Sequence, residues 1–586
     1  MLPIPPSEYH YADPSQNDEA QSVPIRPFVD RLHFPTLGAP ALLTPDRPLE
    51  ALVSLPEAES PSSITLTLVD RHTHTSDLPL TLLAPPVSLG LGPSGKTGRR
   101  QLWHVRASLT DVPPRLYDLR LRSTSSDETQ PNAVRVYAEI TGREKVVFCG
   151  DAQFHVDNAV CLRRFVEHMN ARDDVAWIAL IGDVCDNHVA SSFNILKLAI
   201  SAKPGPVAPY YEEEYPGARE ILVELNKPVV LVPGNHDGMV AYHDYLPGTA
   251  TDTYLGPDPK NQVAYDGLHH FRRTFGPLFH RFDWHKTRYL ATNTFELDRH
   301  QRLGYHAIVA NWGGWMRPEQ VAWLADEIAD AKERGLHRVA FMHHDPRGGA
   351  NGKHLGYYKE YRSGDYQSTG DIAIAYARYL FGYARAWQQE WMRWREASLQ
   401  EHPVKKLLSM LLESELWAVV MGHDNESWVD SYFEAEGIFT SDAHTLQFAA
   451  SPEEATSDPN VVKDAADLMK DNDVEGLMKL LEDRPEEERQ SILRKAYERV
   501  GAEPGIAGAP AMFAPDEVNG WGLRARAAIH FVHVDDIGAY KYSRERDFKD
   551  YGYVVAELRD GKPVRIQRFD ASQQTPGKVI SLLEED

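Results

Sequence analysis

Hydrophobic and polar positions follow two different patterns along the chain, and the change comes near Gly142. Before this glycine, short runs of alternating apolar and polar residues are separated by Pro, Gly and Ser, as in LEALVSL, SITLTLVD, LWHVRASL, YDLRLRS and AVRVYAEI. A period of two is typical of strands that bury one face. We therefore expect a small all-β sandwich over about residues 28–142.

After Gly142, apolar strands alternate with segments of helical periodicity. The strands are VVFC, WIALI, VVLV, VAFM and WAVVM, and the helices include AVCLRRFVEHMNA and RPEQVAWLADEIADAKERG. The second helix has Pro318 at the first helical position, which proline favours. This alternation predicts an α/β domain with helices on the faces of its sheet, over residues 143–586.

Three further segments depart from these patterns. Residues 1–27 are rich in Pro, Ser and acidic groups, and we expect an extended arm. Helical insertions are expected at about 355–415, which is rich in aromatic residues, and at about 452–518, which is acidic.

Composition and charge narrow the classes of function. The 586-residue chain has a formal charge of −23, which disfavours binding to nucleic acid or to anionic membranes. The N-terminal residues lack the basic start and apolar run of a secretion signal, and no apolar stretch is long enough to span a membrane. With only three cysteines, a disulfide framework is not expected. We expect a soluble, cytoplasmic protein.

Polar motifs follow the predicted strands of the α/β domain. They are GDAQ at 150–153, GDVCDN at 182–187, GNHD at 234–237, HHDP at 343–346 and GHDN at 422–425. Ligands of open α/β sheets bind beyond the carboxyl ends of the strands, so residues far apart in sequence can converge there. Each dipeptide alone is more often a turn or a helix cap than a metal site. Together and in this order they predict a metal centre.

The order and content of these motifs resemble the calcineurin-like metallophosphoesterases, and GNHD after an apolar strand is the most specific element. The resemblance implies a four-layer α/β/β/α core, here preceded by an Ig/fibronectin-like β-sandwich. It also implies two divalent metal ions that activate water for the hydrolysis of a small phosphate ester. Carried over by motif, the metal ligands would be Asp151, Gln153, Asp183, Asn235, His343, His423 and Asn425.

Two of these positions depart from the family pattern. Gln153 and Asn425 stand where the family has histidines, and amide oxygens are harder and weaker ligands than imidazole. We therefore expect Mn²⁺ or Fe²⁺, with Mg²⁺ or Zn²⁺ as alternatives. The residues that could replace the missing imidazoles are His155, His188, Asp424 and His444.

The choice between His343 and His344 is open in the sequence. The first position after a strand favours His343, whereas the spacing to Pro346 favours His344. We prefer His343.

The catalytic residues are expected in the GNHD motif. The side chains of Asn235 and His236 leave the turn in different directions, so His236 is assigned to protonating the leaving oxygen, with Asp237 orienting its ring. Asn235, Arg347 and Lys353 are candidates for contacts to the substrate. We expect a phosphoester hydrolase, with a diester slightly preferred to a monoester. The alternative is a degenerate relative that uses the fold for binding or scaffolding.

Overall fold

The computed structural model describes the larger part of the chain and leaves several segments outside. The described residues are 28–70, 77–95, 98–155, 159–185, 209–238, 268–296, 316–344, 346, 410–411, 414–423, 428–433, 438–441, 459–470, 474–481, scattered positions between 484 and 496, 515–516, 520–521, 529–534, 536–538, 552–570 and 576–581. The expected arm at 1–27 and nearly all of the expected insertion at 355–415 lie outside them.

The first part of the described chain forms two sheets. The four-stranded sheet has the order β1 (Leu32–Phe34), β3 (Leu49–Pro56), β7 (Gly98–Ala107) and β6 (Val87–Gly95). The five-stranded sheet has the order β2 (Ala41–Leu43), β9 (Asp127–Val136), β8 (Leu116–Arg122), β4 (Thr65–Val69) and β5 (Leu78–Pro79). Leu52 and Val105 of the first sheet share one hydrophobic cluster with Leu68, Leu119 and Val134 of the second. The alternating pattern thus predicted strands here correctly.

The rest of the chain builds two larger sheets. The six-stranded sheet has the order β12 (Val229–Val232), β11 (Val175–Ile181), β10 (Lys145–Cys149), β22 (Gly552–Arg559), β23 (Lys562–Asp570) and β24 (Pro576–Ser581). The seven-stranded sheet has the order β13 (His280–Trp284), β14 (Thr287–Ala291), β15 (His337–Met342), β16 (Ala418–Met421), β21 (Ile529–His533), β17 (Trp428–Phe433) and β18 (Ile438–Ser441). Strands β10, β11 and β12 are parallel, as are β14, β15, β16 and β21.

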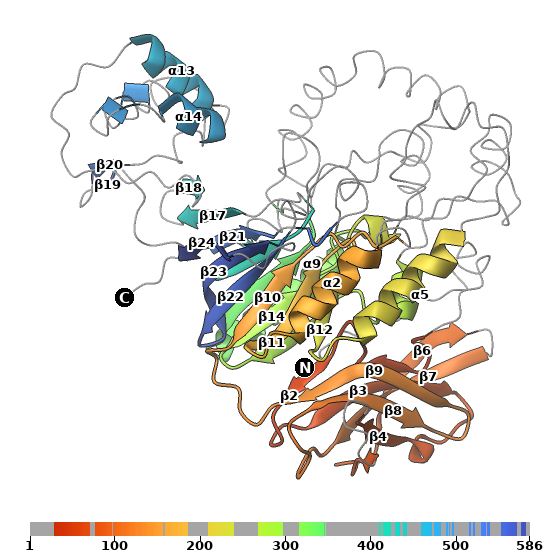
Figure 1. Ribbon diagram of the computed structural model, residues 1–586. Helices are drawn as coiled ribbons and strands as arrows, with labels where there is room; N and C mark the ends of the chain where they lie inside the picture. The colour runs from red at the N-terminus through yellow and green to blue at the C-terminus, as the bar shows by residue number, and fades with distance from the viewer. Residues whose placement is uncertain are drawn as a thin grey trace, which may run out of the picture.

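Six α-helices lie among the described residues. They are α2 (Ala159–Asn170), α5 (Pro209–Val223), α7 (His269–Thr274), α9 (Pro318–Glu333), α13 (Pro459–Lys470) and α14 (Val474–Leu481). Figure 1 shows α2 and α5 side by side across the six-stranded sheet, with strands β2 to β9 gathered apart from it. The predicted α/β class is therefore confirmed, and α2 and α9 fall on the two segments with helical periodicity.

Strand β10 shows how the core of the α/β part is divided. Val146 and Phe148 belong to a cluster that includes side chains of both large sheets. Val147 and Cys149 belong to a second cluster, which includes Phe165 of α2. Since successive side chains of a strand point to opposite faces, one face of β10 meets the other sheet and its opposite face meets a helix. The strand is buried on both faces, and this explains its continuous apolar sequence.

Helices α13 and α14 lie within the segment where an acidic helical insertion is expected, and they pack against each other. Their buried residues include Ala465 and Leu477. Among the helices that the structure describes, none is long and apolar enough to cross a membrane.

Candidate metal centre

The motif residues lie just beyond the carboxyl ends of five strands of the two large sheets. Asp151, Asp183 and Asn235 follow β10, β11 and β12, while His343 and His423 follow β15 and β16. The backbone is left-handed at Asp151 (φ 49°), Asp183 (φ 53°) and His423 (φ 76°). Residues other than glycine rarely adopt this conformation, and such strain is concentrated at functional sites.

Glycines next to these residues leave room for the ligands of neighbouring strands. A Cβ atom at Gly234 would lie 2.2 Å from Oδ1 of Asp183, and one at Gly182 would lie 1.9 Å from Nδ1 of His343. Gly182 also has a positive φ of 86°. The glycines of the GD and GN dipeptides are therefore required by the close packing of the motifs on one another.

His343 lies at the middle of the cluster. Its Nδ1 lies 3.0 Å from the carbonyl oxygen of Ile181, an arrangement in which Nδ1–H donates a hydrogen bond. Its Nε2 lies 3.0 Å from Oδ1 of Asn235, 3.1 Å from Nδ1 of His423 and 3.3 Å from Oδ2 of Asp183. The bond to the carbonyl fixes the ring and directs Nε2 to the side where the other donor atoms gather, as in metal-binding histidines.

Asp183 connects the two halves of the cluster. Its Oδ1 accepts a hydrogen bond of 2.8 Å from the backbone N–H of His236, while Oδ2 faces His343. The Nε2 atom of His236 lies 3.9 Å from the same Oδ2, so the ring of His236 reaches the cluster from the GNHD turn. A carboxylate between several donors is the arrangement expected of a bridging ligand.

Buried polar atoms at the site remain without a hydrogen-bond partner in the part of the chain that the structure describes. Asp151 accepts a hydrogen bond of 2.8 Å from the backbone N–H of His423 through Oδ2, but its buried Oδ1 has none. The buried Nδ2 of Asn235 also lacks one. Because burying an unsatisfied carboxylate oxygen is costly, Asp151 Oδ1 fits the role of a metal ligand.

Burial and neighbouring charged side chains shift the pKa values of the site residues. Burial by itself would lower the pKa of His343, but Asp183 and Asp151 raise it to about 9. Burial would raise the pKa of Asp183, but His343 and His236 hold it below its ordinary value. Burial, with a smaller contribution from Asp183, raises the pKa of Asp151 well above the ordinary range. Such a cluster attracts positive charge strongly.

Two groups of side chains have the spacing needed to hold a metal ion. The donor atoms of Asp151, Asp183 and His343 lie within 4.8 Å of one another, and so do those of His343, His344 and His423. The two groups share His343. The residues present therefore fit a centre for divalent cations, with carboxylates on one side and imidazoles on the other.

Both histidines of the HHDP motif lie at the site. The ring of His344 is 4.7 Å from that of His423 between centroids, and its Nδ1 lies 2.8 Å from Oγ1 of Thr294. The backbone N–H of His344 also donates a hydrogen bond to Thr294. Sequence reasoning preferred His343 and did not consider Thr294, which lies in a part of the chain without a recognised motif.

Gln153 lies where the resemblance placed a ligand. Its backbone N–H donates to the carbonyl oxygen of Asp183 at 2.7 Å, and its Nε2 lies 3.4 Å from Oδ2 of Asp183. The amide of the side chain thus lies beside the carboxylate of Asp183.

The carboxylate of Asp237 contacts the backbone of two neighbouring turns. Its oxygens accept hydrogen bonds from the backbone N–H groups of Val184, Cys185 and Gly234, at 3.2, 2.9 and 2.8 Å. Burial, reinforced by Asp183, raises the pKa of Asp237 to about 7. Asp237 therefore ties the GD turn to the GN turn, and the short spacing of the GNHD motif reflects this backbone contact.

Several expected site residues lie outside the described residues. They are His188, Arg347, Lys353, Asp424, Asn425 and His444. Of the other residues considered as replacements, His155 is buried and its Nε2 lies 3.9 Å from Oε1 of Glu214.

Asp536 was missed in the sequence although a signal was present. It is fully buried, pairs with Gly150 in a parallel β-bridge and contributes to raising the pKa of Asp151. It follows the apolar strand β21 as the other acidic residues follow theirs, but no recognised motif includes it.

The sequence comparison finds a family similarity in the middle of the chain. Residues 144–377 match the family model of the calcineurin-like phosphoesterases. Asp151, Asp183, Asn235 and His343 lie within this range, while His423 lies beyond it. This region of the chain is therefore similar to the calcineurin-like phosphoesterases.

Two individual proteins are similar to parts of the chain. The glycerophosphodiester phosphodiesterase GpdQ of Enterobacter lignolyticus (strain SCF1) is 31% identical over 135 residues, which are 23% of this chain and 37% of that protein. The chain thus spans little more than a third of the length of this curated relative. A solved structure described as GAP50, the anchor in the inner membrane complex of Plasmodium, is 9% identical with a TM-score of 0.26, over 76% of this chain and 90% of that one.

Proposed function

We propose that the protein is a metal-dependent phosphoester hydrolase that uses two divalent cations, with a preference for phosphodiesters. The observation that carries this proposal is the convergence of Asn235, Asp183 and His423 on Nε2 of His343. Asp151 lies in the same group of possible ligands, and its buried Oδ1 has no hydrogen-bond partner among the described residues. Acceptor atoms crowded together in a buried place are unfavourable without a cation.

The proposed ligands fall into two sets that share Asp183. Asp151, Asp183 and Gln153 would hold one cation, while Asp183, Asn235, His343 and His423 would hold the other. A 180° turn of the Gln153 amide would present its oxygen in place of its nitrogen. When bound, the cations supply an activated water molecule and offset the negative charge of the phosphate.

Residues of the chain supply the remaining steps. His236 is on the same side of the cluster as Asp183 Oδ2, at 3.9 Å, and is the proposed donor of the proton to the leaving oxygen. Asp237 holds the turn that carries His236 through its hydrogen bonds to backbone N–H groups. His344, fixed by Thr294, would line the imidazole side of the centre.

Mn²⁺ or Fe²⁺ is proposed as the native metal. The amide of Gln153 and the carboxylates of Asp151 and Asp183 are oxygen ligands, which favour harder cations than a site made of imidazole alone. The preference for a diester draws support from the relative named as a glycerophosphodiester phosphodiesterase, which is 31% identical over 135 residues.

The test combines metal content with turnover. Protein purified without chelator would be analysed for bound metals and assayed with p-nitrophenyl phosphate, bis(p-nitrophenyl) phosphate and a glycerophosphodiester. We expect about two divalent ions per chain and faster turnover of the diesters. Asp183→Asn should lose both metal and activity, since this carboxylate is proposed to serve both cations.

A matched control is His168→Asn in the last turn of α2, which changes a histidine outside the motifs and should leave metal and turnover unchanged. Protein that binds no metal, or that binds metal but cleaves no ester, would overturn the hydrolase proposal in favour of a binding or scaffolding role.

The finer architecture is also proposed. The two sheets within residues 28–142 would form an Ig/fibronectin-like sandwich around their shared cluster. The two large sheets with α2, α5 and α9 would form four layers, α/β/β/α, in a catalytic domain of residues 143–586. The burial of β10 on both faces supports this arrangement.

A further inference from the structure

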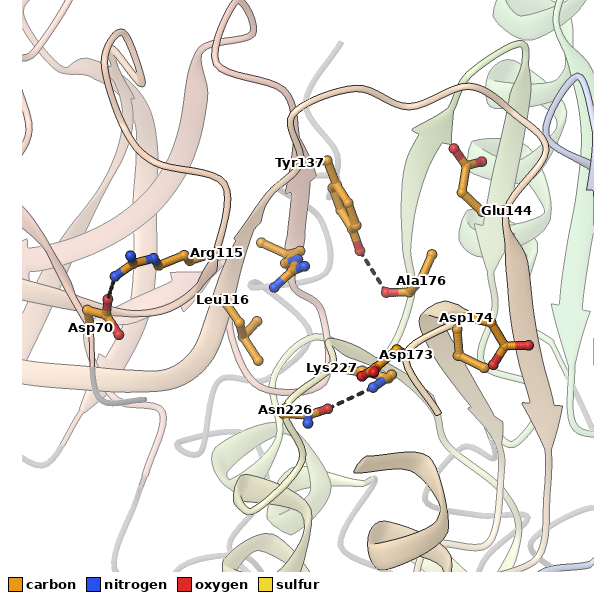
Figure 2. Close-up of a pocket in the computed structure, with 12 residues that line it drawn as sticks. Asp70, Arg115, Leu116, Tyr137, Glu144, Asp173, Asp174, Ala176, Asn226 and Lys227 are labelled. Carbon is orange, nitrogen blue, oxygen red and sulfur yellow. Dashed lines mark hydrogen bonds and ion pairs between the residues drawn. The ribbon is translucent and has the colours of Figure 1, made fainter. Parts of the chain in front are cut away.

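A cavity of about 520 Å³ lies where the first two sheets meet the α/β part. Leu116, Arg135 and Tyr137 line it from the first part, and Asp173, Ala176 and Lys227 line it from the second. Figure 2 shows these walls, with the hydroxyl of Tyr137 pointing toward the carbonyl of Ala176. That hydrogen bond is 2.9 Å long and joins the two walls directly.

Most charged groups around the cavity already have partners. Arg115 pairs with Asp70 at 2.6 Å. Asp174 pairs with Lys145 and Arg172. These pairs leave little net charge at the rim.

Glu144, another acidic residue of the cavity wall, also has hydrogen-bond partners. Its oxygens accept hydrogen bonds from Thr141 and from the indole N–H of Trp284. Asp173 is the other carboxylate on the wall, and it is exposed to solvent.

Lys227 is the unusual member of the wall. Its side chain is buried, with only 7% of the residue exposed. Within the described ranges, its Nζ donates a single hydrogen bond, to Oδ1 of the adjacent Asn226 at 2.8 Å. Among the described residues it forms no ion pair. Burial lowers the pKa of Lys227, although Asp173 acts in the opposite direction. A buried ammonium with a single neutral partner is unfavourable unless an anion joins it.

Arg135 faces the same cavity from the other wall. Its guanidinium carbon lies 5.1 Å from the centroid of the Tyr137 ring, and its buried Nε has no hydrogen-bond partner among the described residues. Stacking on an aromatic ring holds a guanidinium flat and leaves its edge for a planar or tetrahedral anion. The cavity therefore combines two cations without a carboxylate partner in the described part of the chain, and one of them is stacked on the ring of Tyr137.

We propose that this cavity binds a small organic anion, whose phosphate or carboxylate head lies between Lys227 and Arg135 and whose remainder rests near Leu116 and Tyr137. A ligand held in this way contacts both parts of the chain, so its binding would strengthen their attachment to each other.

The cavity is separate from the metal centre. It lies at the amino ends of β11 and β12, where Val175 and Lys227 are found, whereas the metal centre lies at the carboxyl ends of the same strands. Strand β11 spans residues Val175–Ile181, and at about 3.3 Å per residue the two sites are roughly 20 Å apart. The proposal does not depend on the proposed hydrolase activity.

The test measures anion binding by isothermal titration calorimetry with inorganic phosphate and with succinate, at constant ionic strength. We expect one of the two to bind, and the better ligand identifies the head group. Lys227→Met and Arg135→Gln should each weaken this binding by about tenfold or more. Arg47→Gln, which removes an exposed arginine elsewhere, should leave it unchanged. Asp183→Asn, which disrupts the metal centre, should also leave this binding event in place.

Thermal unfolding supplies a second measurement. Without ligand, Lys227→Met should raise the melting temperature, because it removes a buried charge and keeps the packing of the side chain. The wild-type protein, but not Lys227→Met, should be stabilised by the bound anion. The proposal is overturned if neither anion binds, if Arg135→Gln and Lys227→Met bind as well as the wild type, or if Lys227→Met lowers the melting temperature.

Discussion

The two ring nitrogens of His343 have different functions. Nδ1 is fixed by the carbonyl oxygen of Ile181, and Nε2 faces Asn235, Asp183 and His423. A single backbone contact thus determines which nitrogen is available to a cation. It also links the end of β15, in one large sheet, to the end of β11, in the other.

Replacing His236 tests whether this residue donates a proton to the leaving oxygen without holding a metal ion. We expect His236→Ala to retain nearly all of its metal and to lose about 10² to 10⁴ in kcat, because its ring is proposed to reach the leaving oxygen and not the cations. Metal analysis and steady-state kinetics on the same preparation measure both quantities.

A substrate with an acidic leaving group provides the control for His236. Such a group departs without a proton, so the loss should be much smaller for bis(p-nitrophenyl) phosphate than for a glycerophosphodiester. Unchanged kcat on the glycerophosphodiester would remove the acid role from His236.

The buried side chain of His280 should make the unfolding free energy of the protein depend on pH. It is fully buried in β13, neither ring nitrogen has a hydrogen-bond partner among the described residues, and burial lowers its pKa from 6.5 to about 3. The depressed pKa means that its contribution is complete above pH 6.5 and is lost as the pH falls toward 3. We therefore compare the unfolding free energy of His280→Leu with that of the wild type at two pH values. The variant should gain about 3 kcal/mol over the wild type at pH 4, beyond any difference between the two proteins at pH 8.

Urea denaturation of both proteins at pH 4 and pH 8 checks this prediction, with pH 8 as the internal reference. His33 has a similarly depressed pKa, also because of burial, so the variant should keep part of the acid sensitivity. An equal difference between the two proteins at both pH values would show that His280 does not titrate on unfolding.

Sequence reasoning found residues whose place follows from strand periodicity and missed those placed by tertiary contacts. Asp151 and Asp183 could be predicted because each follows an apolar strand. The bonds of Asp237 to Val184 and Cys185 could not, since they join turns more than 50 residues apart in the chain. The role expected for Asp237 came from its neighbour in sequence and did not include these backbone partners.

At the scale of elements, the turns after β11 and β12 are packed so closely that only glycine fits between them. Gly234→Ala would put a Cβ atom 2.2 Å from Oδ1 of Asp183. We expect a loss of about 1–3 kcal/mol in unfolding free energy, together with a clear fall in bound metal, because Asp183 must move. Chemical denaturation and metal analysis measure the two effects.

Gly335→Ala is the matched control for this effect. Gly335 follows α9 with a φ of 69°, and a Cβ atom there would meet no atom within 4 Å. We expect a loss of about 1 kcal/mol from backbone strain alone, with metal content unchanged. Equal metal content in the two variants would contradict the packing argument.

The elements themselves were predictable to different degrees. Strands such as β11 and β15 are buried on both faces and read as continuous apolar runs, so they stood out. Strands β13 and β14 did not, because HRFDW and TRYLA carry charged residues that interrupt the apolar pattern. Arg288 of β14 is fully buried and forms ion pairs with Glu327 and Asp330 of α9. No local sequence pattern reveals these contacts.

At the scale of the whole molecule, the first two sheets are attached to the α/β part through the end of α5. Asn132 is 1% exposed and has a φ of 51°, a conformation that asparagine tolerates better than most residues. Its Nδ2 donates hydrogen bonds to the carbonyl oxygens of Val223 and Leu225, at 3.0 and 2.9 Å. A side chain from one part thus satisfies the last carbonyls of a helix in the other.

Asn132→Asp should weaken this attachment. The change keeps the shape but replaces two donated hydrogen bonds by a carboxylate that faces two carbonyl oxygens at the negative end of a helix. We expect a loss of roughly 3 kcal/mol at pH 7 in chemical denaturation. Asn170→Asp is the control, since Asn170 Nδ2 makes the same kind of bond to the carbonyl of Glu224 in a more exposed place. If Asn132→Asp costs no more than this control, the contact to α5 does not hold the two parts together, and direct contacts such as the hydrogen bond from Tyr137 to Ala176 would carry the attachment.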